Sequence, residues 1–355
     1  MEQIAPPALK ESYDNVGLLV GSPTHKTDKA LLCIDITEEI IDEAIRKNAG
    51  LIIAHHPIIF GGIKKLTGST YVERSIIKAI KHDIAIYAAH TNLDAITGGV
   101  SFKMAEKLHL KNCRVLQPSQ GTLSKLVTFV PVSHVEPVRK ALFDAGAGNI
   151  GNYDSCSFNT EGAGTFRANE HANPFVGEIG VMHTEREIRI ETVFPSHLQH
   201  KIIHALRTAH PYEEVAFDVY RLQNPNPEIG MGVIGELETE TDALEFAQMV
   251  KKIFSCQAIR HTAFPSKKIK TVALCGGSGS SLLHEAMAQK ADAFVSADFT
   301  YHKFFDAENR IFIVDTGHFE SEQFTVEIFY EILSKKIANF AFLFSEINTN
   351  PINYL

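Results

Sequence analysis

Short, uninterrupted apolar runs that lead into helix-like segments are the feature that most restricts the fold of this chain. Residues 30–37 (ALLCIDIT) run directly into EEIIDEAIRK. Thr37 can cap that helix, and the two glutamates complement its positive end. Residues 51–54 and 84–89 are also continuous apolar runs, as expected for strands buried on both faces. This alternation of strands and helices predicts an α/β domain with parallel strands.

The middle of the chain has a different pattern after about residue 120. Strand-like residues 126–132 and 187–193 are separated by the helix-like segments VEPVRKALFDAG and LQHKIIHALRTAH, and a further strand is expected at 216–221. The order strand-helix-strand-strand-helix-strand is that of a ferredoxin-like α+β unit. The segment NPNPEIGMG, residues 224–232, is predicted to be the linker that leaves this unit.

The first pattern returns beyond about residue 235, with strand-like runs at 271–274, 293–297 and 311–315. A chain of 355 residues also exceeds the usual size of one hydrophobic core. We therefore expect a discontinuous, mostly parallel-sheet α/β core made of residues 1–122 and 229–355. An inserted ferredoxin-like α+β domain would occupy residues 123–228.

Composition and charge narrow the class of protein. The formal charge is −8, from 34 basic and 42 acidic residues, which provides no net basic field for nucleic acid. The five cysteines form no C-x-x-C pair, which fits a reducing cytoplasm. Neither a signal-peptide pattern nor an apolar run of about 18 residues is present, which argues against export and membrane insertion.

His55 and His56, followed by Pro57, come directly after a predicted buried strand. Neighbouring side chains of a strand point to opposite faces, so both imidazoles reach one site only if the backbone bends there. Pro57 favours such a bend, because it cannot continue a ladder of hydrogen bonds. Ligands of open parallel sheets collect at this edge. The alternative is an accidental pair of histidines in a polar loop.

The next predicted strand ends in the segment AAHTNLD, which places His90 and Asp94 at the same edge. Asp94 can be a metal ligand there, and His90 can transfer protons. A plain turn or capping role for Asp94 is the alternative.

The segment DTGHFESE places His318 and Glu322 four residues apart after another predicted strand. On a helix that begins near Gly317, the two side chains share a face and can hold one ion. The alternative is an ordinary first helical turn, in which the acidic residue complements the helix dipole and His318 is solvated.

Together these segments offer five imidazole and carboxylate ligands and no thiolate, which suits a catalytic or exchangeable site better than a structural zinc site. The candidate metal ligands are His55, His56, Asp94, His318 and Glu322. Five ligands with shared carboxylates suit two divalent ions about 3.5–4 Å apart that activate water. Zinc is expected in the purified protein, with manganese, iron or cobalt as alternatives.

Two further segments come after predicted strands. Asp298 and His302 can orient metal ligands or exchange protons, although Asp298 can also simply cap a helix. The glycines at 276, 277 and 279 resemble an anion cradle, but the G-x-G-x-x-G spacing and the lysine of a P-loop are missing. A tight strand-to-helix turn is the preferred interpretation, and we expect no organic cofactor.

Several segments, in this order, resemble the GTP cyclohydrolase I type 2-like proteins, also called the NIF-three-like family. They are APPALKESYDNVGLLVGSP, IIAHHPIIFGGIKKLTG, YAAHTNLDAITGGVS, ALCGGSGS and VDTGHFESEQF. The resemblance spans essentially the whole chain, and its HHP and GH-x-x-x-E segments are specific. Residues 146–153 and 210–214 are similar to the PII and CutA proteins, whose domain some members carry as an insertion.

The resemblance implies a two-metal centre on the same five ligands and a toroidal homohexamer with its metal sites facing an internal cavity. Three departures stand out. The chain starts close to its Pro-Pro pair, so that the first helix is expected to be short or absent. Tyr13 replaces a tryptophan, and Ser296-Ala297-Asp298 stands where many relatives have Thr-Gly-Asp.

Two functions follow as alternatives. The first is a cytoplasmic metal-dependent hydrolase that acts on a nucleotide, a cyclic amide or a phosphoester, with opening of the GTP ring as the reaction that the family name implies. The second is a metal-binding scaffold or regulator without turnover, in which the inserted domain senses a small-molecule effector.

Overall fold

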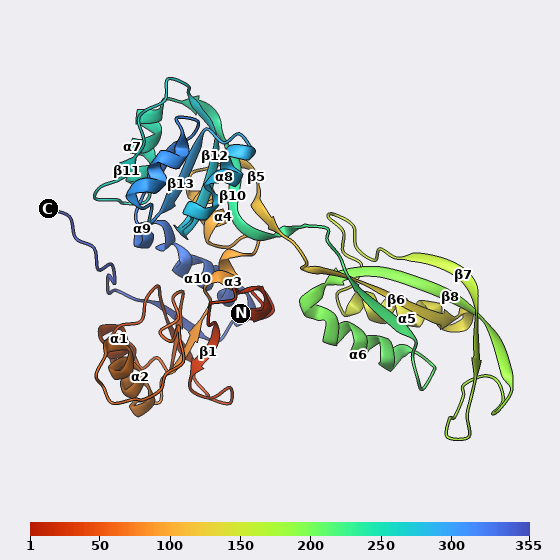
Figure 1. Cartoon of the computed structure of the whole chain (residues 1–355). Coiled ribbons are helices and arrows are strands. Elements are labelled where there is room, and N and C mark those ends of the chain that lie inside the picture. The colour runs from red at the N-terminus through yellow and green to blue at the C-terminus, as the bar shows by residue number, and fades with distance from the viewer. The chain divides into compact units, whose positions relative to one another are not determined.

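The chain divides into two compact units in the computed structural model, which describes residues 1–355 (Figure 1). Unit 1 comprises Met1–Pro118 and Pro227–Leu355, and unit 2 comprises Ser119–Asn226. The fold is mixed α/β with three sheets. None of its helices combines the length and the apolar character that crossing a bilayer requires.

The first sheet of unit 1 has five strands in the order β1-β4-β3-β2-β15. Its strands are β1 (Gly17–Val20), β2 (Lys29–Cys33), β3 (Leu51–Ala54), β4 (Ala85–Ala88) and β15 (Ala341–Phe344). Strands β15, β2, β3 and β4 are parallel, and β1 pairs with β4 antiparallel. The helices that follow these strands are α1 (Glu38–Lys47), α2 (Tyr71–Lys81), α3 (Thr91–Asp94) and α4 (Val100–Lys107).

Both faces of this sheet are covered, which explains its continuous apolar strands. Leu31 and Ile52 pack into the core that includes α1 and α2. Their neighbours Leu32 and Ile53 pack into a second core with α10 (Thr325–Lys336). Strands buried in this way are rigid supports for the residues that follow them.

The second sheet of unit 1 has six strands in the order β11-β14-β13-β12-β10-β5. Its strands are β5 (Lys111–Ser119), β10 (Asn226–Thr241), β11 (Arg260–His261), β12 (Ile269–Ser278), β13 (Ala293–Ala297) and β14 (Phe312–Asp315). Strands β12, β13 and β14 are parallel. The remaining helices are α7 (Ala243–Ile253), α8 (Leu283–Ala288) and α9 (His318–Glu322), with 3₁₀ turns η1 (Pro7–Leu9), η4 (Ser280–Leu282) and η5 (Tyr301–Ala307).

Unit 2 is a four-stranded antiparallel sheet in the order β7-β8-β6-β9, with two helices. Its elements are β6 (Leu123–Pro131), η2 (Val132–His134), α5 (Val135–Asp144), β7 (Phe158–Arg167), β8 (Met182–Pro195), η3 (Ser196–Leu198), α6 (Gln199–Ala209) and β9 (Phe217–Arg221). Leu126, Val130 and Ile190 form its core with α5 and α6. The predicted order of strands and helices in this segment is confirmed.

Local details confirm some predictions and correct one. Thr37 caps α1, accepting a hydrogen bond from the backbone N–H of Ile40. The predicted linker at 224–232 is wrong from residue 226 onward, because β10 begins at Asn226. Ile229 is buried, and a Cβ at Gly230 would overlap the carbonyl oxygen of Gln117. The glycine therefore serves close packing rather than flexibility.

We expect Ile52→Ala to lower the free energy of unfolding by about 2–5 kcal/mol, because it leaves a cavity under the strand that carries the histidine pair. Ile52 is fully buried, whereas Ile80 on α2 is 56% exposed, so Ile80→Ala is the matched control and should cost far less. Urea denaturation followed by circular dichroism measures both. Equal losses would contradict the two-sided burial of β3.

Candidate metal centre

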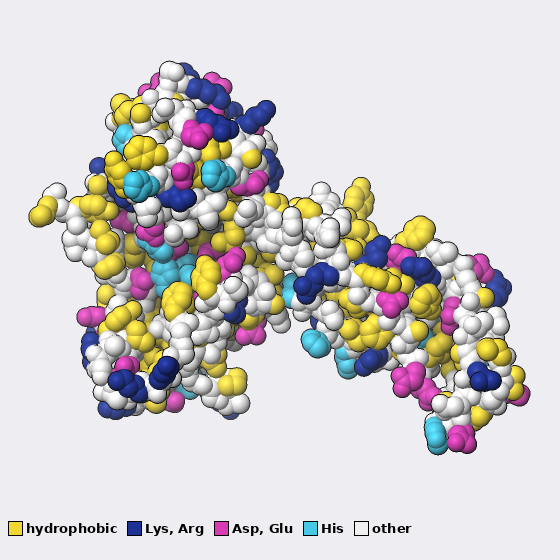
Figure 2. Space-filling view, in the orientation of Figure 1, with side chains coloured by type: hydrophobic (Ala, Val, Ile, Leu, Met, Phe, Trp, Pro, Cys, Tyr) yellow, Lys and Arg dark blue, Asp and Glu magenta, His cyan; other side chains and the backbone are white.

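The parallel strands of both sheets of unit 1 end near one place, where the candidate residues gather. His55 and His56 follow β3, and His90 follows β4. Asp94 ends α3, while His318 and Glu322 open and close α9, which follows β14. Figure 2 shows histidine side chains with acidic ones beside them in a hollow on this face of unit 1. The sheet edges therefore act as the platform of the site.

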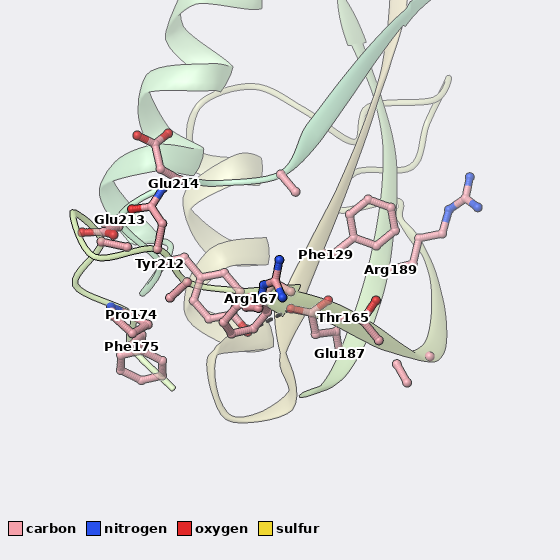
Figure 3. A pocket seen from close by; sticks show the side chains of 18 of the residues that line it. Phe129, Thr165, Arg167, Pro174, Phe175, Glu187, Arg189, Tyr212, Glu213 and Glu214 are labelled. Atoms are coloured by element: carbon pink, nitrogen blue, oxygen red, sulfur yellow. Dashed lines mark hydrogen bonds between the residues drawn. The ribbon is translucent and has the colours of Figure 1, made fainter. Parts of the chain in front are cut away.

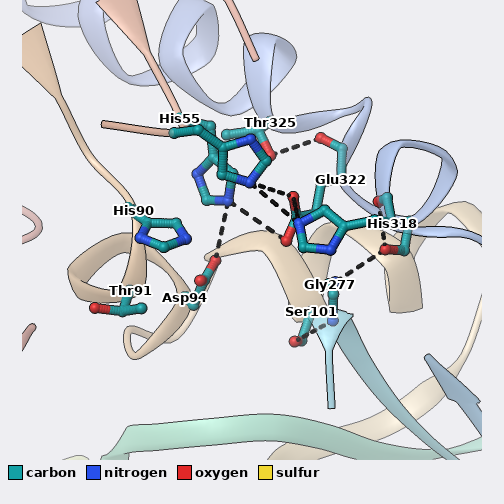
Figure 4. A network of polar contacts seen from close by, with 12 residues as sticks. His55, His90, Thr91, Asp94, Ser101, Gly277, His318, Glu322 and Thr325 are labelled. Carbon is teal, nitrogen blue, oxygen red and sulfur yellow. Dashed lines mark hydrogen bonds and ion pairs between the residues drawn. The ribbon is translucent and has the colours of Figure 1, made fainter. Parts of the chain in front are cut away.

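The four other predicted ligands lie around Glu322, and Figure 4 shows His55, Asp94 and His318 on its sides. Its Oε2 atom lies 2.9 Å from Nε2 of His56 and 3.1 Å from Nε2 of His318. Its Oε1 atom lies 3.7 Å from Nε2 of His55, which is itself 3.8 Å from Oδ1 of Asp94. The predicted sharing of one helical face by His318 and Glu322 is thus observed, and both histidines of the adjacent pair reach the same pocket.

In each imidazole, Nδ1 contacts a supporting residue and Nε2 faces Glu322, so the partner of Nδ1 determines whether Nε2 is free to bind a metal ion. Nδ1 of His55 lies 2.9 Å from the carbonyl oxygen of Ala89, which can only accept, so Nδ1 carries the proton. Nδ1 of His56 lies 2.7 Å from Asp35, and Nδ1 of His318 lies 2.7 Å from Asp298. Acceptors in these positions fix the rings and direct each Nε2 atom into the pocket, where it can bind a metal ion once it has lost its proton.

The pocket gathers imidazole nitrogens and carboxylate oxygens that can bind a cation. Nε2 of His55 and Oδ1 of Asp94 are buried without a hydrogen-bond partner, and Oε2 of Glu322 is buried beside the Nε2 atoms of His56 and His318. Nε2 of His56 and Nε2 of His318 lie only 3.2 Å apart. Buried acceptors that face each other repel unless a positive charge lies between them. The donor set of imidazole and carboxylate fits zinc, manganese, iron or cobalt.

The shifted pKa values of three candidate ligands also indicate that the pocket favours added positive charge. Burial disfavours the imidazolium of His56, but Asp35 and Glu322 outweigh it and raise the pKa to about 9. Burial acts likewise on His318, where Asp298 and Glu322 raise the pKa to about 11. Burial and the neighbouring Glu322 raise the pKa of Asp94 to about 8. Protons and metal ions would compete for the same positions.

His90 lies beside the cluster rather than at its centre. Its ring is 5.1 Å from that of His55 and 5.3 Å from that of His56. Its Nδ1 lies 3.0 Å from Asp14, whose pKa is held below its usual value, against the opposing effect of burial, by His90 and Thr91. Nitrogen atoms of His55, His56 and His90 are close enough to hold an ion together.

The two other predicted residues differ in their placement. Asp298 orients His318 and has a positive φ of 57°, a strained backbone for aspartate that often marks functional sites. His302 is exposed, and its ring lies against Tyr301 and Phe305. No hydrogen bond or ion pair joins His302 to the candidate ligands.

The tight turn preferred for the glycine segment is found only at Gly279, which joins β12 to η4, whereas Gly276 and Gly277 lie within β12. The backbone N–H of Gly277 donates to Oγ of Ser321, and that of Gly279 donates to Oγ of Ser296. Gly277 has a φ of +61°, and a Cβ there would overlap Oε1 of Glu322. The glycine thus makes room for a candidate ligand, and its amide is already used within the protein.

Sequence reasoning missed three residues that support the ligands: Asp14, Asp35 and Thr349. Asp35 follows β2 just as His55 follows β3, so the rule used for the ligands could have found it. Oγ1 of Thr349, near the end of the chain, donates to Asp35 at 2.6 Å. No sequence pattern pointed to that contact, because it joins residues 314 positions apart.

Comparison with known proteins decides the family. The sequence model of Duf34/NIF3 (NGG1p interacting factor 3) matches residues 1–351. This chain belongs to the Duf34/NIF3 family. A Bacillus subtilis protein named GTP cyclohydrolase 1 type 2 homolog is 39% identical over 360 residues, covering 100% of this chain and 96% of the relative. A Halalkalibacterium halodurans protein of the same name is 40% identical over 359 residues, with the same coverage.

Solved structures agree with this assignment. A Bacillus cereus protein related to NIF3 is 40% identical and matches with a TM-score of 0.86, covering 100% of this chain and 96% of that one. A Staphylococcus aureus protein is 29% identical and matches with a TM-score of 0.76 at the same coverage. The Duf34/NIF3 fold therefore extends over the whole chain, including unit 2.

We expect Asp35→Asn to weaken the binding of a divalent metal by about 10- to 100-fold, because His56 loses the carboxylate that orients it. Asp42→Asn is the control, since Asp42 lies on the surface of α1 and pairs with Lys78. Competition against a chromophoric chelator measures the affinity of each variant for zinc. Equal affinities for the two variants would show that Asp35 does not support the site.

Proposed function

We propose that this Duf34/NIF3 protein is a metal-dependent hydrolase with two divalent ions in unit 1. The residues that would hold the ions are His55, His56, Asp94, His318 and Glu322. The observation that carries the proposal is the group of imidazole nitrogens and carboxylate oxygens that face one another around the buried Glu322. Metal ions bound there would lower the pKa of a water molecule and polarise the substrate.

Glu322 would be the ligand that the two ions share. Its Oε1 faces His55, and its Oε2 faces His56 and His318. Asp94 lies on the His55 side, which gives each position imidazole and carboxylate donors. The carbonyl of Ala89 and the carboxylates of Asp35 and Asp298 hold the three imidazoles in their tautomers.

His90 is the residue best placed to move protons. Its side chain is 13% exposed, so it can exchange protons with solvent, and its ring borders those of His55 and His56. Asp14 orients its Nδ1 atom. Asp298 can accept a proton from His318, whereas the exposed His302 would need a substrate that reaches the end of β13.

A cavity of about 550 Å³ borders His56 and His318 and can receive a substrate. Arg260 is the one lysine or arginine in its lining, where it pairs with Asp315, and it is the group that would meet an anionic substrate. The names of the relatives suggest GTP, whose guanine ring would be opened with loss of formate. Another nucleotide, a cyclic amide or a phosphoester fits the same chemistry.

The wider proposal concerns assembly and the inserted unit. We infer a cytoplasmic, toroidal homohexamer that carries zinc when purified, on the strength of the family resemblance. The order β6-α5-β7-β8-α6-β9, with the segments 146–153 and 210–214, supports a PII/CutA-like identity for unit 2. A scaffold or regulator without turnover is the competing function, and the following experiment separates the two.

We expect His318→Ala and Glu322→Ala to lose both metal stoichiometry and turnover, because each removes a donor from the shared position. Protein reloaded with zinc, manganese, iron or cobalt is offered GTP and a panel of phosphoesters, and bound metal is counted by elemental analysis. Loss of turnover by at least about 100-fold in both variants supports the hydrolase.

His261→Ala is the control for this experiment. His261 is an exposed histidine whose ring lies against Phe264 and which belongs to neither group of possible metal ligands, so its removal should change neither measurement. Metal that binds without turnover under any loading would instead favour the scaffold. Full metal content in both ligand variants would overturn the assignment of the site.

We expect the binding of metal to strengthen as the pH rises. The pKa values of about 9 for His56, about 11 for His318 and about 8 for Asp94 predict that all three side chains hold a proton at pH 7 until a metal displaces it. Release of two to three protons would raise the apparent association constant about 100- to 1,000-fold per pH unit between pH 6 and 8. Calorimetry in buffers of different ionisation enthalpy counts the protons, and affinity that does not change with pH would contradict this account.

A further inference from the structure

Unit 2 contains a cavity of its own, of about 680 Å³ (Figure 3). Phe129, Glu187 and Arg189 line it from the face of the sheet opposite the one that packs on α5 and α6. Residues 160–167 of β7 and the segments 168–175 and 212–216 complete the lining. A volume between about 300 and 1,000 Å³ is the usual size of a small-molecule site.

Glu187 is a buried carboxylate in this cavity without a cationic partner. It is only 8% exposed, and its Oε1 accepts one hydrogen bond, at 2.9 Å, from the hydroxyl of Tyr212. A Cβ at position 164 would overlap its Oε2, so Gly164 makes room for the carboxylate. No lysine, arginine or histidine lies within ion-pair distance of Glu187. A buried carboxylate of this kind costs free energy unless it meets a positive charge.

The His210-Pro-Tyr-Glu-Glu segment holds this arrangement in place. Nδ1 of His210 accepts the backbone N–H of Tyr212 at 3.1 Å, so Nε2 carries the proton and donates to the carbonyl of Phe129 at 2.9 Å. His210 is thus a neutral imidazole that links β6 to the segment containing Tyr212, and burial lowers its pKa. These hydrogen bonds hold the Tyr212 hydroxyl in contact with Glu187.

Four aromatic rings line the cavity that contains this carboxylate. Tyr212 lies 6.2 Å from Phe166 and 6.1 Å from Phe175, measured between ring centroids, and Phe129 lines the same cavity. The faces of aromatic rings attract cations, and cages of such rings bind organic ammonium groups. Aromatic rings and a buried carboxylate together favour a ligand with an apolar body and one positive charge.

The other charged side chains of the cavity do not cancel its preference for a cationic ligand. Four carboxylates and two guanidinium groups line the cavity: Glu161, Glu187, Glu213, Glu214, Arg167 and Arg189. Arg189 is engaged by Glu191 at 2.8 Å, and Arg167 is exposed. Oε1 of Glu213 accepts the backbone N–H of Asn173 at 2.8 Å and so ties down the segment that covers the cavity.

We propose that unit 2 binds a small organic ammonium ion with an apolar or aromatic body. The ammonium group pairs with Oε2 of Glu187, and its body lies among Phe129, Phe166, Phe175 and Tyr212. This site is built from residues of unit 2 alone and does not depend on the proposed hydrolase. Failure of one proposal therefore leaves the other standing.

The test compares 2-phenylethylammonium with 2-phenylethanol, two molecules of similar size that differ in charge, by calorimetry on the full-length protein at pH 7. We expect saturable binding of the ammonium ion at least about tenfold tighter than that of the alcohol. This comparison needs no variant. Equal affinities, or no binding of the ammonium ion at 10-fold molar excess and millimolar concentration (roughly the weak limit of a specific site), would overturn the proposal.

Two variants locate the site. Glu187→Gln keeps the size of the side chain and should weaken the binding of 2-phenylethylammonium by about tenfold or more. Glu161→Gln is the matched control, because Glu161 lines the same cavity but is exposed and pairs with Arg186. It should change the affinity less than about twofold. Unchanged affinity in Glu187→Gln, or equal losses in both variants, would place the ammonium elsewhere, and the melting temperature of each variant verifies its folding.

Discussion

The candidate metal centre of unit 1 depends on one electrostatic constraint: three imidazole nitrogens and two carboxylates lie close together in a buried pocket. Glu322 is 3% exposed and is approached by three imidazoles, whose Nε2 atoms can each hold either a proton or a metal ion. Such a group is stable only with added positive charge. Outer contacts from Asp35, Asp298 and the carbonyl of Ala89 then determine the direction from which each imidazole faces that charge.

The two sheets explain how distant segments satisfy this constraint. Parallel strands place their carboxyl ends at one edge, and each edge contributes short, specific segments rather than long flexible loops. β3 and β4 supply His55, His56 and His90, while β13 and β14 supply Asp298 and His318. Gly277, near the end of β12, allows the close approach that Glu322 requires. The close-packed cores on both faces of the strands hold the strand ends in place, and this restricts the movement of the candidate ligands that follow them.

Much of this was predictable from the sequence, because strand ends and helical spacing are local properties. The α1 cap at Thr37, the strand β3 and the shared helical face of His318 and Glu322 follow from neighbouring residues. The contact between Thr349 and Asp35 and the pairing of β15 with β2 could not be predicted, since they join segments about 300 residues apart. The linker expected at 224–232 failed for the opposite reason: tertiary packing against Gln117 overrode the local signal of proline and glycine.

Units 1 and 2 each contain a buried carboxylate. The side chains around each carboxylate determine which kind of cation it favours. Around Glu322 the neighbours are imidazoles, which donate electron pairs and favour a metal ion. Around Glu187 they are aromatic faces and one tyrosine hydroxyl, which offer no lone pair strong enough for a transition metal but attract an organic cation. A buried carboxylate therefore favours a metal ion in unit 1 and an organic cation in unit 2, because the neighbouring side chains differ.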